Sequence, residues 1–261
     1  MIEQDLKIAF NRRVAARTFL MGIWSPEMAG LSGPGQFVMI RVGPGMDPLL
    51  RRPFSIAGVE GKEIFLVLYQ VVGRGTALLS QVREGDRLSV LGPLGRGFDG
   101  STAGSDPLLI GGGVGIAPLL FLYRSLGGKG VTFMAGFGTG PDVVPVQEMG
   151  LEKGDIDLST DDGAVGHKGM VTDLLEARLA ERAGDVSTIF ACGPPPMLRR
   201  VADLAFPRNI PFQVSLETAM ACGVGACQGC VVKTSGKTVA YYRACREGPV
   251  FDARDVDWRS L

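Results

Sequence analysis

The sequence predicts an α+β multidomain protein in three parts: an N-terminal antiparallel β-barrel over residues 1–100, a parallel, doubly wound α/β domain over 101–215, and a small C-terminal module over 216–261. Three observations predict this division. Short strand-like runs separated by Gly and Pro fill the first part, strand and helix patterns alternate in the second, and four of the five cysteines fall in the third. Closely spaced strands are typical of small barrels, and strand–helix alternation is typical of parallel sheets.

The composition excludes several classes of protein. The 27 basic and 27 acidic side chains cancel, and no block of five basic residues occurs, so we expect no nucleic-acid partner. The sequence has neither a long apolar run nor a signal-peptide pattern, so we expect no membrane span and no secretion. Because four cysteines have a metal-binding spacing, a reducing, cytoplasmic compartment is expected.

The first part contains strands and two candidate binding motifs. The predicted strands include 36–42, 63–72 and 87–91, and only Thr76–Val82 has a helical pattern. Arg52–Ser55 stands at the start of a strand, where arginine offers a fork for a phosphate and the aromatic ring offers a stacking surface. Gly73–Thr76 precedes the short helix and could seat a pyrophosphate. The simpler alternatives are a surface arginine and an ordinary hairpin turn.

The second part begins after a polar linker, 99–107. An apolar strand from Leu108 then meets the glycine turn Gly111–Gly115, and a helix with an apolar face follows. Strands and helices alternate at 131–137, 156–160, 172–183, 187–193 and 196–205. The glycine turn differs from the G-x-G-x-x-G fingerprint, so the residues alone leave open a nucleotide site or a tight strand-to-helix turn.

Two further features of this part bear on a nicotinamide site. Gly136–Asp142, after the second strand, has no arginine for a 2′-phosphate, which favours NAD over NADP. His167, the only histidine, lies in a glycine-rich loop and is assigned no catalytic role.

The third part contains Cys222, Cys227 and Cys230 in a C-x4-C-x2-C spacing, with Cys245 after fourteen intervening residues. This is the plant-type spacing for a 2Fe–2S cluster, and interspersed glycines let the backbone curl around the sulfurs. A structural zinc site usually pairs its ligands as C-x2-C twice, so the spacing favours the cluster over zinc. Cys192 lies outside this set and is either a ligand contact or a small buried hydrophobe.

These motifs together resemble the ferredoxin–NADP reductase superfamily, in which a barrel binds a flavin and an α/β domain binds a nicotinamide. Phe54 stands where tyrosine is common in that family, so stacking is kept and a hydroxyl is lost. The resemblance implies FAD contacts at Arg52, Pro53, Phe54, Ser55, Leu68, Tyr69, Gln70, Gly75 and Thr76. It implies NAD contacts at Gly111, Gly112, Gly113, Gly115, Cys192, Gly193, Pro194 and Met197.

The order of the three parts, with Glu217–Cys230 and Cys245–Ala253, resembles more narrowly the electron-transfer subunits of NAD-dependent dihydroorotate dehydrogenases. That resemblance implies a path from the FMN of a partner catalytic subunit, through the 2Fe–2S cluster and FAD of this chain, to NAD⁺ in pyrimidine biosynthesis. It also implies a heterotetramer with two copies of each chain. A (β/α)8 barrel for dihydroorotate oxidation would need about 250 residues of its own, so we expect no catalytic residue for that step here.

Two alternatives to this function remain at the level of sequence. The chain could be the small flavin and iron–sulfur subunit of a ferredoxin–NADP or sulfide-linked oxidoreductase. It could also be a non-enzymatic cluster protein that senses redox state, although a sensor would leave the flavin and nicotinamide motifs unexplained.

Overall fold

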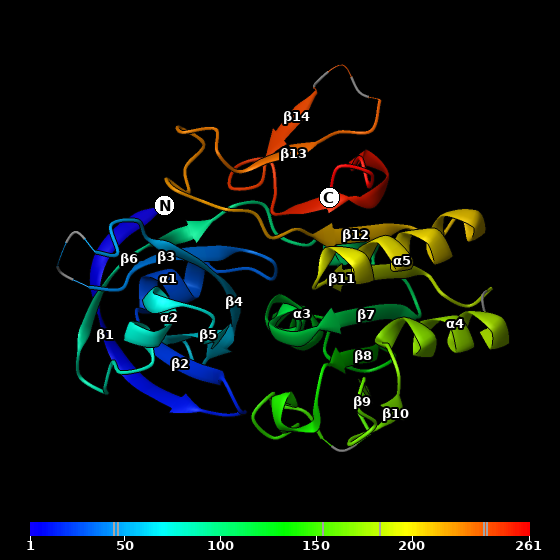
Figure 1. Ribbon diagram of the computed structural model, residues 1–261, viewed down its shortest axis with the longest axis horizontal. Helices are drawn as coiled ribbons and strands as arrows, with labels where there is room; N and C mark the ends of the chain where they lie inside the picture. The colour runs from blue at the N-terminus through cyan, green and yellow to red at the C-terminus, as the bar shows by residue number, and fades with distance from the viewer. Residues whose placement is uncertain (44, 46, 153, 183, 237, 239) are drawn as a thin grey trace.

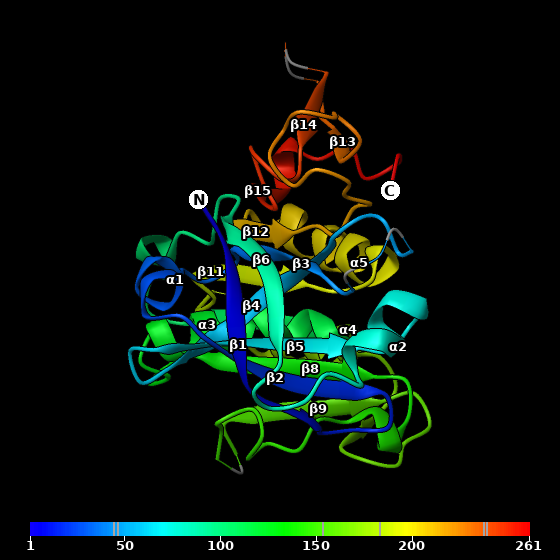
Figure 2. The same cartoon turned by 90° about the vertical axis from the view of Figure 1, so that its left-hand side faces the viewer.

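The computed structural model has three adjoining parts (Figures 1 and 2) and describes residues 1–261 except 44, 46, 153, 183, 237 and 239. A closed six-stranded barrel lies beside a seven-stranded sheet, and a two-stranded hairpin stands above the sheet. The predicted fold class is confirmed. No helix within the described part of the chain is long and apolar enough to cross a membrane.

The barrel strands are joined antiparallel in the order β1-β2-β5-β4-β3-β6, and β6 closes on β1. They are β1 (Ile2–Arg13), β2 (Thr18–Trp24), β3 (Phe37–Arg41), β4 (Arg52–Glu60), β5 (Ile64–Gln70) and β6 (Arg87–Leu94). Because strand side chains alternate between faces, Phe65, Val67 and Tyr69 of β5 fill the barrel interior. Leu66 and Leu68 point outward and pack in the core of the neighbouring α/β part.

Two short helices flank the barrel: α1 (Pro26–Leu31) and α2 (Arg74–Leu79). The prediction of a single helix in this part is wrong, because α1 is too short to show a repeating apolar face. Its signal is local instead: the Ser25 hydroxyl accepts a hydrogen bond from Met28 N at 3.2 Å, and Pro26 begins the first turn. Helix α2 begins two residues before the predicted start, Thr76, and ends three residues before the predicted end, Val82.

The second sheet has the order β10-β9-β8-β7-β11-β12-β15, and every pair is parallel except β12 with β15. Its strands are β7 (Pro107–Gly112), β8 (Thr132–Phe137), β9 (Ile156–Thr160), β10 (His167–Lys168), β11 (Thr188–Cys192), β12 (Phe212–Ser215) and β15 (Val250–Asp252). Helix α3 (Ile116–Ser125) packs on one face, whereas α4 (Val171–Arg182) and α5 (Pro195–Ala205) pack on the other. The sheet is therefore doubly wound, as predicted. The predicted end of α4, Ala183, lies outside the described residues.

Five short 3₁₀ turns complete the described elements: η1 (Gly100–Thr102), η2 (Gly113–Gly115), η3 (Gly140–Asp142), η4 (Phe206–Arg208) and η5 (Ala253–Asp255). Turn η1 lies inside the predicted linker. Turn η2 is the predicted glycine turn, and it joins β7 directly to α3.

The C-terminal part contributes the hairpin β13 (Val231–Lys233) and β14 (Tyr241–Arg243) and then adds β15 to the edge of the large sheet. Cys230 and Cys245 of this part share one hydrophobic core with Met39 of the barrel and Val214 of β12. The sheet thus crosses the predicted boundary at 215/216, and the three domain limits stay predictions.

Arg124, near the end of α3, joins the barrel to the α/β part. Its Nη1 donates to the Ala57 carbonyl oxygen of β4 at 3.2 Å, and its Nη2 donates to the Met149 carbonyl oxygen at 2.6 Å. A Cβ atom on Gly58 would lie 2.3 Å from Nη1, and one on Gly150 would lie 2.7 Å from Nη2. The guanidinium therefore occupies a seam that two glycines leave open.

We expect Gly150→Ala to destabilise the protein more than the control Gly61→Ala. The two glycines have φ angles of +67° and +62°, so an alanine carries a similar backbone cost at each, about 1–2 kcal/mol. Only at Gly150 does the new Cβ meet Arg124, because nothing lies within 4 Å of a Cβ on Gly61. Crowding of this kind costs a further ~1–3 kcal/mol, which urea unfolding would measure. Equal losses of unfolding free energy in the two variants would show that Arg124 moves aside at no cost.

Candidate functional site

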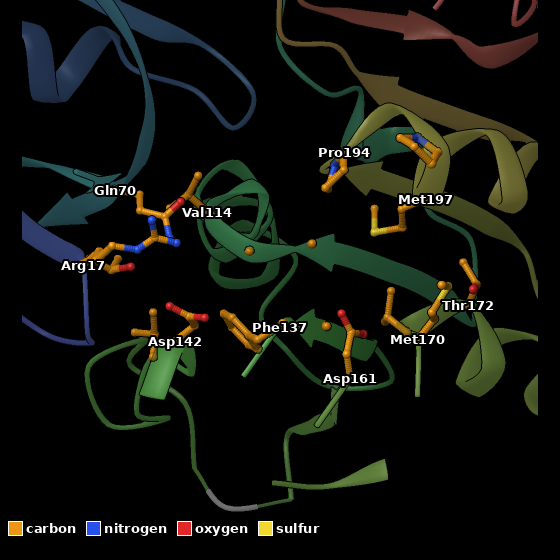
Figure 3. A pocket seen from close by; sticks show the side chains of 18 of the residues that line it. Arg17, Gln70, Val114, Phe137, Asp142, Asp161, Met170, Thr172, Pro194 and Met197 are labelled. Carbon is orange, nitrogen blue, oxygen red and sulfur yellow. The ribbon is translucent and has the colours of Figure 1, made fainter. Parts of the chain in front are cut away.

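The first cavity, of about 480 Å³, lies at the carboxyl ends of β7, β8 and β9 (Figure 3). Gly112 ends β7, Phe137 ends β8 and Asp161 follows β9, and all three line the cavity. This edge of an open parallel sheet is where such folds bind ligands. Pro194 and Met197 close the cavity on the side of α5, and Figure 3 shows Met197 pointing into it.

A second cavity, of about 390 Å³, lies between the barrel, the start of α3 and the chain that follows β12. Its walls are largely apolar and include Phe54, Leu68, Leu216 and Met220. Gln70 and Val114 line both cavities, so the two are contiguous. A flat ring in the second cavity and a flat ring in the first could therefore lie against each other.

Eight of the nine residues predicted to contact FAD line the second cavity: Arg52, Pro53, Phe54, Ser55, Leu68, Tyr69, Gln70 and Thr76. Gly75, the ninth, does not line it but makes room for Arg52, whose Nε lies 2.9 Å from the position of a Cβ on Gly75. The Arg52 guanidinium also contacts the Leu50 carbonyl oxygen. The two motifs that lie apart in the sequence thus meet at one wall.

Tyr69 and Phe54 form an aromatic corner of this cavity. Their ring centroids are 5.7 Å apart in an edge-on arrangement, and the Tyr69 hydroxyl donates to Asn11 Oδ1 at 3.0 Å. Burial raises the pKa of Tyr69 to about 12, although the Asn11 hydrogen bond lowers it, so the phenol stays neutral. Because the Tyr69 hydroxyl is hydrogen-bonded to Asn11, this aromatic corner presents only ring surface to the cavity.

The Thr76 hydroxyl holds the turn that leads into α2. Its oxygen accepts from Val72 N at 2.9 Å and from Gly73 N at 3.1 Å, and it donates to the Gly73 carbonyl oxygen at 3.0 Å. The turn is therefore held by hydrogen bonds within the chain.

The predicted NAD residues divide into two groups. Gly112 and Gly113 line the first cavity. Gly111 and Gly115 do not, and each is packed too closely for a side chain: a Cβ on Gly115 would lie 2.4 Å from the Cys192 carbonyl oxygen. These two glycines let α3 start directly beneath the sheet edge. Glycine is therefore needed at both positions because a side chain would not fit.

Cys192 and Gly193 lie behind the wall of the first cavity. The Cys192 side chain is 1% exposed, and burial, with the nearby charge of Glu217, raises its thiol pKa strongly. Gly193 backs Met197, because a Cβ there would lie 2.7 Å from Met197 Cε. Of the two alternatives for Cys192, the structure favours the small buried hydrophobe.

Four charged side chains in the lining of the first cavity were not predicted: Arg17, Asp142, Asp161 and Arg200. Asp161 directly follows β9, so its position after a predicted strand could have identified it. Its neighbour Asp162 has a local role, since its carboxylate accepts from Gly140 N and Ala164 N at 3.0 Å each. Arg17 reaches the cavity from the turn between β1 and β2, which no local pattern indicates.

The second cavity also includes unpredicted residues from the C-terminal part, notably Glu217 and Met220. Glu217 is exposed at the mouth of the cavity, yet the surrounding protein desolvates its carboxyl and raises the pKa. Met220 lies two residues before Cys222, so the cavity wall runs directly into the cysteine loop. His167 lies outside the lining of both cavities, with Nε2 3.6 Å from Asp173 Oδ2.

The four predicted ligand cysteines form two pairs. Cys230 and Cys245 are buried, with their sulfurs 3.2 Å apart. Cys227 is exposed, and its backbone N–H donates to Cys222 Sγ at 3.4 Å. Burial acts to raise the pKa of Cys222, but this and other backbone N–H donors lower it to about 6, so the loop stabilises a thiolate.

This arrangement fits a two-iron cluster better than one zinc ion. Within the described residues, no three His, Cys, Asp or Glu side chains converge as ligands of a single metal ion. Two cysteine pairs, in contrast, suit two irons that each take two thiolates. Gly223 and Gly225 have φ angles of +72° and +80°, which the backbone needs to wrap around the sulfurs.

Comparisons with known proteins agree with this site. Residues 217–257 match the family model described as the iron-sulfur cluster binding domain of dihydroorotate dehydrogenase B. The electron transfer subunit of dihydroorotate dehydrogenase B (NAD(+)) from Bacillus caldolyticus is 42% identical over 258 residues, which cover 97% of this chain and 98% of that protein. The same subunit from Desulforamulus reducens is 39% identical with the same coverage.

A solved structure is also similar over nearly the whole chain. It comes from work on flavin-based electron bifurcation and is an NADH-dependent reduced ferredoxin–NADP oxidoreductase. Its TM-score is 0.84 at 32% identity, and the match covers 98% of this chain and 91% of that one.

The fold and the two joined cavities define a reductase of the ferredoxin–NADP reductase type with an appended iron–sulfur module. Within that class, the chain belongs to the family of dihydroorotate dehydrogenase B (NAD(+)) electron transfer subunits. Both resemblances found in the sequence are confirmed. The chain is thus an electron-transferring subunit of an NAD-dependent oxidoreductase, and its family name implies a partner catalytic subunit.

We expect Cys245→Ala to lose most of its iron and its visible absorption, because one iron is left a ligand short. Cys192→Ala is the matched control, since it removes another buried thiol outside the four. Iron and sulfide analysis, with electron paramagnetic resonance of the reduced protein, would measure both. Full iron content in the Cys245 variant would exclude that residue as a ligand.

Proposed function

We propose that this chain carries electrons from the FMN of a dihydroorotate dehydrogenase catalytic subunit, through a 2Fe–2S cluster and FAD, to NAD⁺ in pyrimidine biosynthesis. The observation that carries the proposal is the contiguity of three features: the cysteine loop, the second cavity and the first cavity. A cluster moves single electrons, a nicotinamide takes two at once as hydride, and a flavin can do both.

The residues of the second cavity would hold FAD. Arg52 supplies a fixed cation for a phosphate, braced against Gly75. Phe54 and Tyr69 supply ring surface, and their apolar neighbours exclude water from the reacting face. Glu217 places a carboxyl at the mouth of the same cavity, where desolvation keeps it protonated to a higher pH than a free glutamate.

The residues of the first cavity would hold NAD. Gly112 and Gly113 let the nucleotide backbone approach the start of α3 closely. Asp161 would accept hydrogen bonds from a ribose hydroxyl and would repel the 2′-phosphate of NADP. This assignment agrees with the choice of NAD that Gly136–Asp142 favours.

The partner would dock on the cysteine module. Cys227 is exposed there, and Val224, Val231 and Tyr241 are exposed apolar side chains of the same module. Exposed apolar side chains around a redox group suit a partner surface. We place the FMN on that partner and two copies of each chain in the complex.

We place the reaction in the cytoplasm. None of the five cysteines is in a disulfide, which suits a reducing compartment.

A second candidate function is that of a small subunit in a ferredoxin–NADP type oxidoreductase. The near-complete match to the bifurcating enzyme favours it. The higher identity to the dihydroorotate dehydrogenase subunits, 42% against 32%, favours the first proposal.

The direct test is co-purification with a visible spectrum, followed by an assay of NAD⁺ reduction by dihydroorotate. We expect a flavin-containing catalytic subunit to accompany the chain and the complex to reduce NAD⁺. A chain that oxidises NADH but pairs with a different large subunit and ignores dihydroorotate would support the second candidate instead.

We expect Asp161→Asn to lower the preference for NADH over NADPH by about tenfold, because a charged group that repels the 2′-phosphate is lost. Asp157→Asn makes the same charge change on β9, the strand that Asp161 directly follows, at an exposed side chain that does not line the cavity. The ratio of the kcat/KM values for the two nucleotides in dye reduction measures the effect. An equal change in both variants would remove Asp161 from this role.

A further inference from the structure

We propose that Arg243 is a positioning residue that raises the reduction potential of the cluster by holding a backbone N–H against the sulfur of Cys245. The proposal rests on the proposed function, because it assumes that the four cysteines bind a 2Fe–2S cluster. Arg243 itself is not a ligand, and it lies at the end of β14, two residues before Cys245.

Arg243 contacts the cysteine loop from outside. Its Nη1 donates to the Gly225 carbonyl oxygen at 3.1 Å. The N–H of the same residue, Gly225, donates to Cys245 Sγ at 3.1 Å. Arg243 therefore holds Gly225 by its carbonyl oxygen, while the N–H of Gly225 points at the sulfur of Cys245.

Glu247 fixes the guanidinium in place. Glu247 Oε2 accepts from the backbone N of Arg243 at 2.7 Å and from its Nε at 3.1 Å, and Oε1 accepts from Nη2 at 2.5 Å. Such a paired contact between arginine and carboxylate gives a fixed direction as well as an attraction. The remaining nitrogen, Nη1, is left pointing at Gly225.

The backbone of Arg243 also shapes the turn that carries Cys245. Its carbonyl oxygen accepts from the N–H groups of Arg246 and Glu247 at 3.0 Å each. Ala244 N donates to the Cys230 carbonyl oxygen at 2.7 Å, which joins this turn to the other buried cysteine. Arg243 thus links the first cysteine loop to the turn of the fourth cysteine.

Room around Gly225 is limited, so the link is tight. Gly225 has a φ of +80°, and a Cβ on it would lie 3.1 Å from Arg246 Cδ and 3.6 Å from Arg243 Nη1. The loop at Gly225 is therefore packed against both Arg243 and Arg246.

A hydrogen bond to a ligand sulfur stabilises the reduced cluster more than the oxidised one, because the reduced cluster carries one more negative charge. The positive guanidinium acts in the same direction. Losing Arg243 should therefore make the cluster harder to reduce.

The test is the midpoint potential of the cluster in the full, cluster-loaded chain, measured by a redox titration followed by electron paramagnetic resonance. For Arg243→Met we expect the ratio of reduced to oxidised cluster at the wild-type midpoint to fall about tenfold, which corresponds to 59 mV for one electron. We also expect altered g values.

Two further variants separate position from charge. Arg246→Met removes a neighbouring cation that makes no hydrogen bond to Gly225 within the described residues, and we expect a smaller shift. Arg243→Lys keeps the charge but lacks the planar fork that reaches Glu247 and Gly225 together. We therefore expect its midpoint potential to fall nearly as far as that of Arg243→Met.

The outcomes decide the proposal. A wild-type potential in Arg243→Lys, or equal shifts in Arg243→Met and Arg246→Met, would show that charge alone acts and would overturn it. If Arg243→Met does not assemble a cluster, the lysine variant decides. Absence of a 2Fe–2S signal from the wild-type chain would instead contradict the proposed function.

Discussion

The antiparallel pairing of β15 with β12 is the constraint on which the redox site depends. Val214 pairs with Phe251, so the chain leaving β12 and the chain leaving the Cys245 turn run side by side. The first of these chains continues as Leu216 and Met220 into the wall of the second cavity. The position of the Cys245 turn beside that cavity wall is therefore set by strand pairing and a shared core.

Helix α3 sets the position of the two cavities relative to each other. Val114, in the turn just before the helix, lines both of them, and the outer face of the barrel packs on the helix that follows. The turn can lie this close to β11 only because Gly115 has no side chain to meet the Cys192 carbonyl oxygen. The barrel and the sheet thus both pack on α3 where their ligands would meet, and Arg124 joins the other end of the helix to the barrel.

The sequence predicts most of what is local and little of what is not. The cysteine spacing and Arg52–Ser55 are short-range patterns. Their residues gather as expected because one strand places Arg52–Ser55 and one hairpin brings Cys230 to Cys245. The residues of the glycine run left open a nucleotide site or a tight turn, and the family resemblance assigned all four glycines to NAD. In the structure, close packing that depends on β11 separates Gly115 from Gly112. Arg17 could not be found because it reaches the nucleotide cavity from another part of the fold. Helix α1 was missed because six residues carry no periodicity.

The three sites lie in a linear order that has a chemical consequence. Cys227 is exposed, Met220 joins the cysteine loop to the second cavity, and Gln70 joins the second cavity to the first. An electron from a partner therefore meets a one-electron carrier at the surface and a two-electron acceptor only at the far end. The middle position must convert between the two, which a flavin can do and a second cluster or nicotinamide cannot. The order of the sites along the fold thus explains why the second cavity lies between the cysteine module and the nucleotide cavity.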